Sequence, residues 1–217
     1  KRSFLHSADH RQRLVAIALV AMLAYGSMIA IDGLVMREWL DTSFGPTPDL
    51  HIYQGERSDV ALPRVLGHEL VGEVESFGSR VTRFKKGDHV TIDPVVSCGS
   101  CLSCRRGYDN LCSTVKCLGV QVDGGYCDYF AVPEEKVYAL PSNMPWEKAV
   151  LIEPFSISAE VLARSEARAG DKVLVIGAGT IGLCILQAMK LAGADVLITD
   201  FVDSRLEKAN LLGADRC

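Results

Sequence analysis

The feature that most constrains this chain is a group of four cysteines within fifteen residues. They are Cys98, Cys101, Cys104 and Cys112. Two thiolates separated by two residues can bind one ion from a single tight turn, and a fourth thiolate completes the tetrahedral shell that zinc prefers. Such a shell leaves no position open for a substrate, so the group predicts a structural zinc site. Two disulfides, or four small buried apolar side chains, are the alternatives.

Composition narrows the class of protein further. The chain has 217 residues, a formal net charge of −4 and 23% charged residues. This length suits one large domain or two small ones, and the charge balance gives no sign of a nucleic-acid partner. Thiolates that bind zinc imply a reducing compartment, so the sequence predicts a cytoplasmic protein. The chain begins with Lys1 instead of methionine and stops soon after Gly213, which leads us to expect that both ends are cut.

Residues 1–40 contain an apolar run, 14–31, that follows several basic residues. As a helix, the run would span roughly 27 Å, close to the ~30 Å hydrocarbon core of a bilayer. Basic residues before an apolar run also fit a signal peptide or a signal anchor. The segment is therefore a membrane anchor, sequence foreign to the rest of the domain, or a buried core helix. Membrane association is expected through this segment alone.

Residues 41–153 are predicted to form a mostly β, barrel-like module. Short strand-like runs at 89–93, 125–132 and 136–140 are separated by glycine, proline and aspartate turns. Residues 44–48 are rich in helix-breaking residues and predict a loop. Residues 154–169 predict a helix with Ile157, Val161 and Leu162 on one face.

A different pattern begins at residue 172. A short buried strand at 172–176 is followed by a glycine-rich turn, a helix through residue 190 and a second strand at 195–199. The glycines of the turn are Gly177, Gly179 and Gly182. They would let the backbone approach a pyrophosphate, while the helix N-terminus supplies partial positive charge. Asp200 is placed to accept hydrogen bonds from an adenosine ribose and to repel a 2′-phosphate, which favours NAD over NADP. The alternative is a tight turn that binds nothing.

Taken together, these motifs resemble the zinc-containing medium-chain alcohol dehydrogenases. The resemblance rests on the four-cysteine lobe, the dinucleotide fingerprint and the signature Gly67-His68-Glu69-x2-Gly72-x5-Gly78-x2-Val81. Glu153-Pro154 is similar to the polyol and sugar-acid branch, which includes sorbitol, hexonate and threonine dehydrogenases. The match covers about residues 49–217 and leaves residues 1–45 unmatched.

This resemblance implies an α/β fold with a β-barrel part. A GroES-like catalytic domain in residues 41–153 would be followed by the first half of a Rossmann NAD-binding domain in residues 154–217. It also implies a homo-oligomer and a small-molecule partner, an alcohol, polyol or sugar acid.

The resemblance further implies a second, catalytic zinc. His68 would be a direct ligand, Glu69 would lie beside the metal, and Glu153 would hold the place of the third ligand or its water. A Lewis acid in this position polarises an alcohol oxygen and lowers its pKa, so that the alkoxide can release hydride to nicotinamide. A structural His–Glu pair is the alternative.

One part of the family pattern is missing. Residues 49–53 are similar to the end of the family's Cys-Gly-Thr/Ser-Asp-x-His loop, which places Pro46 at the zinc-binding cysteine and Pro48 at the proton-relay hydroxyl. Asp49 and His51 remain, so a catalytic His51 would end a relay that lacks its first member. Loss of one of three protein ligands should weaken zinc binding severely.

Two functions are therefore open. One is a zinc-dependent, NAD-linked dehydrogenase that oxidises a secondary alcohol of a polyol or sugar acid to a ketone and is inactive in this form. The other is a non-catalytic relative that keeps the structural zinc and is tethered to a membrane by its N-terminal segment.

Overall fold

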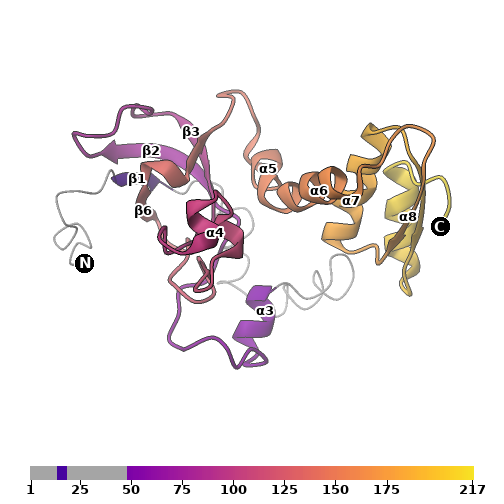
Figure 1. The fold of residues 1–217 in the computed structure, drawn as a ribbon, viewed down its shortest axis with the longest axis horizontal. Coiled ribbons are helices and arrows are strands. Elements are labelled where there is room, and N and C mark those ends of the chain that lie inside the picture. The colour runs from indigo at the N-terminus through magenta and orange to yellow at the C-terminus, as the bar shows by residue number, and fades with distance from the viewer. Residues whose placement is uncertain (1–13, 19–47) are drawn as a thin grey trace. The chain divides into compact units, whose positions relative to one another are not determined.

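The computed structural model describes residues 14–18 and 48–217, which belong to two compact units (Figure 1). The first unit contains residues 14–18 and 57–150, and the second contains residues 48–56 and 151–217. Each unit has its own cluster of buried apolar side chains.

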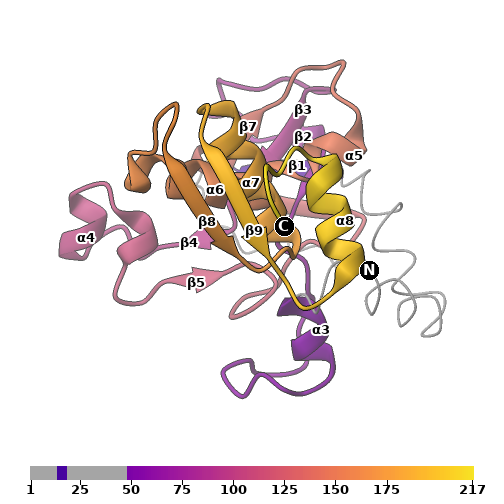
Figure 2. The same ribbon diagram turned by 90° about the vertical axis from the view of Figure 1, so that its right-hand side faces the viewer.

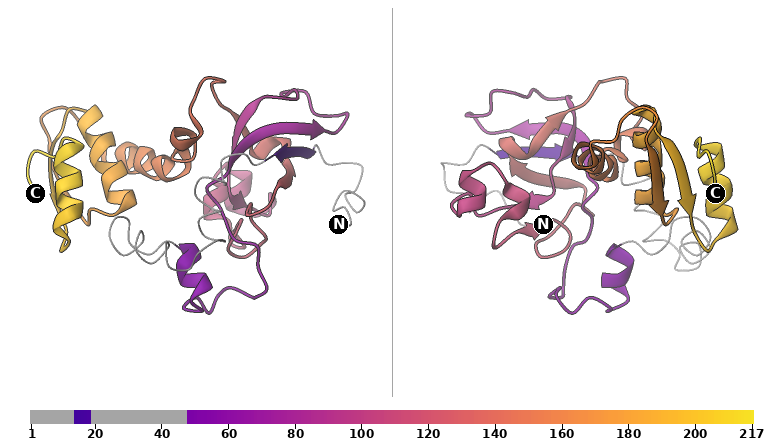
Figure 3. Two further views of the ribbon diagram at one scale, coloured as in Figure 1. Left: turned by 180° about the vertical axis from the view of Figure 1, so that it is seen from behind. Right: turned by 45° about the vertical axis from the view of Figure 1, so that its right-hand side comes forward.

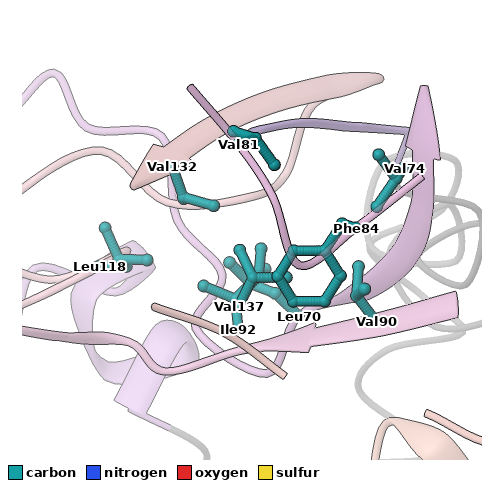
Figure 4. Packing of buried hydrophobic residues seen from close by; sticks show 9 residues of the cluster. All are labelled: Leu70, Val74, Val81, Phe84, Val90, Ile92, Leu118, Val132 and Val137. Carbon is teal, nitrogen blue, oxygen red and sulfur yellow. The ribbon is translucent and has the colours of Figure 1, made fainter. Parts of the chain in front are cut away.

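The first unit is built on a five-stranded antiparallel sheet. In the order of pairing, its strands are β6 (Tyr129–Pro133), β1 (Leu14–Ala18), β2 (Val71–Phe77), β3 (His89–Ile92) and β7 (Val137–Ala139). Buried side chains from β2, β3, β6 and β7 and from neighbouring loops form one core (Figure 4). The described strands form an open sheet and no closed barrel, so this unit is mostly β, as predicted, but not barrel-shaped.

Strand β1 differs from the helical interpretations of the N-terminal apolar run. It pairs antiparallel with β2 on one side and with β6 on the other, so it fills the gap between two strands that are distant in sequence. An apolar run that is flanked on both sides by hydrogen-bonding partners gains more as a strand than as an isolated helix. The rest of the predicted run, 19–31, lies outside the described residues. Within the described residues, no helix is long and apolar enough to span a bilayer.

A small lobe is inserted between two short strands of the first unit. Strands β4 (Val95–Val96) and β5 (Lys116–Cys117) pair antiparallel at its base. The lobe itself contains helix α4 (Leu102–Arg105) and the 3-10 helix η3 (Asp109–Leu111). Two further short helices, η4 (Glu134–Lys136) and α5 (Trp146–Ala149), complete the unit.

The buried carboxylate of Glu134 connects two segments of this unit by hydrogen bonds. Glu134 is 2% exposed, and its Oε1 accepts hydrogen bonds from the backbone N–H groups of Thr82 (2.8 Å) and Arg83 (2.7 Å). In return, Arg83 Nη2 donates to the carbonyl oxygens of Glu134 (3.0 Å) and Val137 (2.6 Å). A buried charge is tolerated only when donors replace its lost water, and these contacts supply the donors.

Replacing Glu134 should therefore destabilise the first unit. We expect Glu134→Ala to lower the free energy of unfolding by about 2–4 kcal/mol, because it leaves buried backbone donors unsatisfied. Urea unfolding followed by tryptophan fluorescence measures this. Glu75→Ala, which removes only the exposed pair with Lys86, is the control and should change stability by about 0.5 kcal/mol or less. Equal effects of the two substitutions would contradict the prediction.

The second unit is a parallel strand pair with helices. Its elements are α3 (Pro48–Tyr53), α6 (Ile152–Ser165), β8 (Lys172–Ile176), α7 (Thr180–Leu191), β9 (Asp195–Thr199) and α8 (Asp203–Leu211). Strands β8 and β9 pair in parallel over their full length, from Lys172 opposite Asp195 to Ile176 opposite Thr199. The two strands lie side by side with α7 on one face (Figures 2 and 3), and the buried side chains of this face join those of α7 in the core. Both strands coincide with the predicted ranges 172–176 and 195–199.

Helix α6 is shorter at its C-terminus than predicted. It ends at Ser165 because Glu166 adopts the left-handed conformation (φ 53°) that terminates many helices. Val161 and Leu162 pack against the core of the second unit, as expected. Ile157 is 44% exposed and is not among the side chains that pack against this core.

Candidate metal and nucleotide sites

The four-cysteine lobe is shaped by backbone conformation and by N–H groups that point at sulfur. Gly99 (φ 66°) and Gly107 (φ 84°) both adopt conformations that other residues rarely take, and each has open space around it. Cys98 Sγ accepts hydrogen bonds from the backbone N–H groups of Ser100 (3.5 Å) and Cys101 (3.3 Å). Cys112 Sγ accepts from the N–H groups of Cys98 and Thr114, both at 3.4 Å.

These contacts hold the four cysteine sulfur atoms close together. All four Sγ atoms lie within 4.8 Å of one another, with 3.4 Å between those of Cys101 and Cys104 and 3.9 Å between those of Cys98 and Cys104. Zinc–sulfur bonds of about 2.3 Å in a tetrahedron place the sulfurs about 3.8 Å apart. The donor set therefore fits zinc. No disulfide joins any of the eight cysteines, all of which belong to the described residues.

Without a metal, the pKa values of Cys98, Cys101 and Cys104 are shifted in different directions. Hydrogen bonds from the Ser100 side chain and from backbone N–H groups lower the pKa of Cys98 to about 5, and the backbone N–H of Cys104 lowers that of Cys101. Burial, together with neighbouring thiols, raises the pKa of Cys104 to about 12. A dication would deprotonate the remaining thiols, so metal uptake should release protons.

The chain should hold one zinc ion at these cysteines, because only this shell is complete in the sequence. Elemental analysis of the purified protein should give about one zinc per chain, and Cys101→Ser should lose it, since three thiolates retain the ion poorly. Cys217→Ser is the matched control, because Cys217 is exposed and belongs to the other unit. Two tightly held ions, or an ion that survives Cys101→Ser, would contradict the assignment.

The glycine-rich turn lies where β8 ends and α7 begins. Gly177 has a φ of +99°, and its N–H donates to the carbonyl of Thr199 on the neighbouring strand (2.7 Å). A Cβ at Gly182 would overlap the carbonyl oxygen of Gly177, so the helix packs against the turn at backbone distance. Gly179 is the N-cap residue of α7, whose first N–H groups are the type that bind phosphate anions.

Asp200 follows β9 and reaches this turn. Its Oδ2 accepts a hydrogen bond from the N–H of Ala178 (2.7 Å), and its Oδ1 accepts from the N–H of Val202 (3.0 Å). Arg205 Nη1 lies 3.5 Å from Oδ2, and the Asp200 side chain is only 9% exposed. These contacts, the one with Ala178 first, lower the pKa of Asp200. Sequence reasoning missed the link to Ala178, because nothing in a glycine fingerprint signals which side chain holds the turn in place.

Asp200 should make the second unit acid-sensitive. Its folded-state pKa lies below the unfolded value of about 3.9, so the carboxylate stabilises the fold above that pH and loses its contribution as the pH falls through the folded pKa. Thermal unfolding between pH 6 and pH 2.5 should show this loss, with a smaller loss in Asp200→Asn. Asp195→Asn, at an exposed position of the same strand, is the control. Parallel pH curves for wild type and Asp200→Asn would refute this role.

The residues implied for the catalytic site fall into two pairs. His68, half-buried, and Glu69, exposed, lie just before β2 in the first unit. Glu153, the third residue implied for the zinc, lies in the first turn of α6, and the relay residue His51 lies on α3, both in the second unit. Because the two pairs belong to different units, their joining in one catalytic site stays a prediction.

Helix α3 carries Pro48 and His51, which the sequence resemblance assigns to a proton relay. Pro46 lies outside the described residues. Pro48 is the first residue of α3, where a proline needs no N–H and its fixed φ suits the helix. His51 Nδ1 lies within hydrogen-bond distance of a carboxylate oxygen of Glu56. Sequence reasoning missed Glu56, which lies beyond the end of the helix, where no helical spacing links it to His51.

Three features of the chain are typical of zinc-containing dehydrogenases. They are the four-cysteine lobe in an antiparallel unit, the Gly-His-Glu segment before β2 and the glycine-rich turn after β8. The chain belongs to the zinc-containing medium-chain alcohol dehydrogenase family. The alcohol dehydrogenase GroES-like domain family matches residues 46–142.

Several curated relatives are similar to this chain over most of its length. The starvation-sensing protein RspB of Escherichia coli is 43% identical over 169 residues, which cover 77% of this chain and 50% of RspB. Sorbitol dehydrogenase of Bacillus subtilis is 39% identical over 171 residues, covering 76% and 48% of the two chains. L-galactonate-5-dehydrogenase of Escherichia coli is 38% identical over 159 residues, covering 73% and 46%. The chain thus spans about half the length of these relatives.

Solved structures agree on the fold. The crystal structure of the alcohol dehydrogenase RspB of Escherichia coli CFT073 in complex with NADH matches with a TM-score of 0.76 and 36% identity. The match covers 94% of this chain and 54% of that chain. The fold is therefore a GroES-like domain followed by part of a Rossmann domain.

Proposed function

We propose that this chain provides the metal-binding and nucleotide-binding parts of a zinc-dependent, NAD-linked dehydrogenase. The reaction is oxidation of a secondary alcohol of a polyol or sugar acid to a ketone. The observation that carries the proposal is the turn at Gly177, which is held by Asp200 at the N-terminus of α7. The relatives named sorbitol dehydrogenase and L-galactonate-5-dehydrogenase support the substrate class, and the RspB complex with NADH supports the cofactor.

In the nucleotide site, Gly177, Gly179 and Gly182 allow the pyrophosphate to approach the first N–H groups of α7. Asp200 uses one lone pair for Ala178 and one for Val202. Each carboxylate oxygen can accept two hydrogen bonds, so capacity remains for a ribose hydroxyl. The same negative charge disfavours a 2′-phosphate, which is why we assign NAD.

In the catalytic site, His68, Glu69 and Glu153 would hold the zinc, with residues 41–153 as the catalytic domain and 154–217 as the nucleotide domain. A zinc ion held there would supply Lewis-acid activation of the alcohol oxygen, with a bound NAD as the hydride acceptor. The His51 imidazole can take up the proton that the alcohol loses, and the carboxylate of Glu56 stabilises the imidazolium that forms. We assign this function to a reducing, cytoplasmic compartment and to a homo-oligomer, as the family resemblance implies.

A non-catalytic relative is the second candidate, and one observation favours it. Pro48 begins α3 at the position of the relay hydroxyl, so this helix offers His51 no hydroxyl partner from that residue. Pro46 likewise offers no thiolate. In this alternative, the chain keeps the structural zinc at the cysteines and the nucleotide turn without turning over an alcohol.

A chimera separates the two candidates through the restored variant: activity after restoration supports the dehydrogenase, and no activity after restoration favours the non-catalytic relative. Fused to the C-terminal half of Bacillus subtilis sorbitol dehydrogenase, this chain should not oxidise sorbitol measurably. Pro46→Cys together with Pro48→Ser should raise the rate by about 100-fold or more, because metal seating and a proton path are both restored. Adding His51→Gln to the restored chimera is the control and should remove most of the gain. Ready turnover by the chimera that keeps both prolines would refute the assignment of these two positions.

A further inference from the structure

Three glycines from two segments meet beside His68. Gly67, the residue before His68, has a φ of +98°, and a Cβ at this position would overlap the ring of Tyr126. A Cβ at Gly119 would lie 2.6 Å from the carbonyl oxygen of Gly67, and a Cβ at Gly124 would overlap that same oxygen. The backbones therefore touch directly, and none of the three positions has room for a side chain.

Hydrogen bonds fix the same contact in register. The N–H groups of Gly124, Gly125 and Tyr126 donate to the carbonyl oxygens of residues 65, 67 and 66, at 2.8, 3.0 and 2.9 Å respectively. Asp123 Oδ1 also accepts from Arg64 Nη1 (2.9 Å) and from the N–H of Val65 (3.2 Å). Residues 64–67 immediately precede His68. Hydrogen bonds and close backbone contacts with residues 119–126 thus fix their position.

Residues 119–126 also follow directly on the part of the chain that leaves the four-cysteine lobe. The chain leaves the lobe through β5, which pairs with β4 at the base. Cys117 at the end of β5 accepts hydrogen bonds through its carbonyl from the N–H groups of Val120 (3.2 Å) and Gln121 (3.1 Å). The N–H of Leu118 donates to the carbonyl of Pro94 (2.9 Å) at the other side of the base. Residues 113–118 connect Cys112 to Gly119, and the last three of them are held by the β4–β5 pairing and by the hydrogen bond of Leu118 with Pro94.

We propose that residues 119–126 are a positioning element, which transmits the ordering of the four-cysteine lobe to His68. Metal binding fixes Cys112 and the paired strands β4 and β5, and these fix the segment that carries Gly119 and Gly124. That segment sets the path of residues 64–67 and so the place of the His68 imidazole. Gly119 and Gly124 are positioning residues in this arrangement. The structural metal site then orients His68 in addition to stabilising its own lobe.

This inference rests on the proposed function only in the role given to His68. Its test measures the surroundings of His68 in the chain as it is, and it requires no dehydrogenase activity. A failed chimera would therefore leave it standing, and a failed test would leave the proposed dehydrogenase standing.

The first experiment removes the zinc with a chelator and restores it with one equivalent, while zinc content is monitored. Histidine side-chain signals are recorded by NMR, with His68→Gln identifying the signal of His68 among the five histidines. We expect the His68 signal to shift or broaden without zinc and to return with it. Amide exchange at Gly124, Gly125 and Tyr126 should accelerate at least about tenfold, while the amide of Gly177, in the other unit, keeps its rate.

The second experiment uses substitutions with zinc bound. Gly119→Ala should move the His68 signal, because its Cβ has no space against Gly67. Gly87→Ala is the matched control: its φ of +88° imposes similar backbone strain, but its nearest contact, Glu73 Oε1, is 3.8 Å away. It should lower the melting temperature without moving the His68 signal. Should Gly119→Ala fail to fold, Asp123→Ala, which removes the acceptor for Arg64 and Val65, provides a milder variant with the same expected shift.

Two results would overturn the proposal. One is a His68 signal and amide exchange at 124–126 that do not change when the zinc is removed. The other is equal loss of protection throughout β2 and β3, which would mean that the metal supports the whole unit and not this segment.

Discussion

Direct backbone contact without an intervening side chain is the constraint on which both candidate sites depend. In the second unit, Gly182 lies so close to the carbonyl of Gly177 that no Cβ fits between helix and turn. In the first unit, Gly124 meets the carbonyl of Gly67 in the same way. A glycine contact of this kind lets a helix N-terminus come close enough to bind a phosphate. It also lets the segment before His68 contact residues 119–126 at distances that any other residue would prevent.

Backbone N–H groups hold several anionic side chains of the described residues in place. Glu134 accepts from two of them in the first unit, and Asp200 accepts from Ala178 and Val202 in the second. The sulfur of Cys98 is held in the same manner. Backbone donors are fixed by the fold, so each anion both depends on its loop conformation and stabilises it.

Features governed by local sequence were predictable, and features governed by distant pairing were not. Strands 172–176 and 195–199 follow from short buried runs next to a glycine turn, and the metal cluster follows from cysteine spacing alone. Strand β1 could not be found, because an apolar run has the same composition in a helix and in a strand, and only its partners β2 and β6 decide. The contacts of Glu134 and Asp200 likewise join residues that no local pattern connects.

The start of α3 shows how backbone structure and reactivity place separate demands on one position. A helix needs no N–H from its first residue, so Pro48 suits the beginning of α3. Under the proposed alignment with the family, the same proline would leave His51 without the relay hydroxyl. The helix itself does not require proline there, and the contact of His51 with Glu56 does not involve Pro48. A serine at position 48 would therefore change the chemistry of this position while leaving the backbone requirement of the helix satisfied.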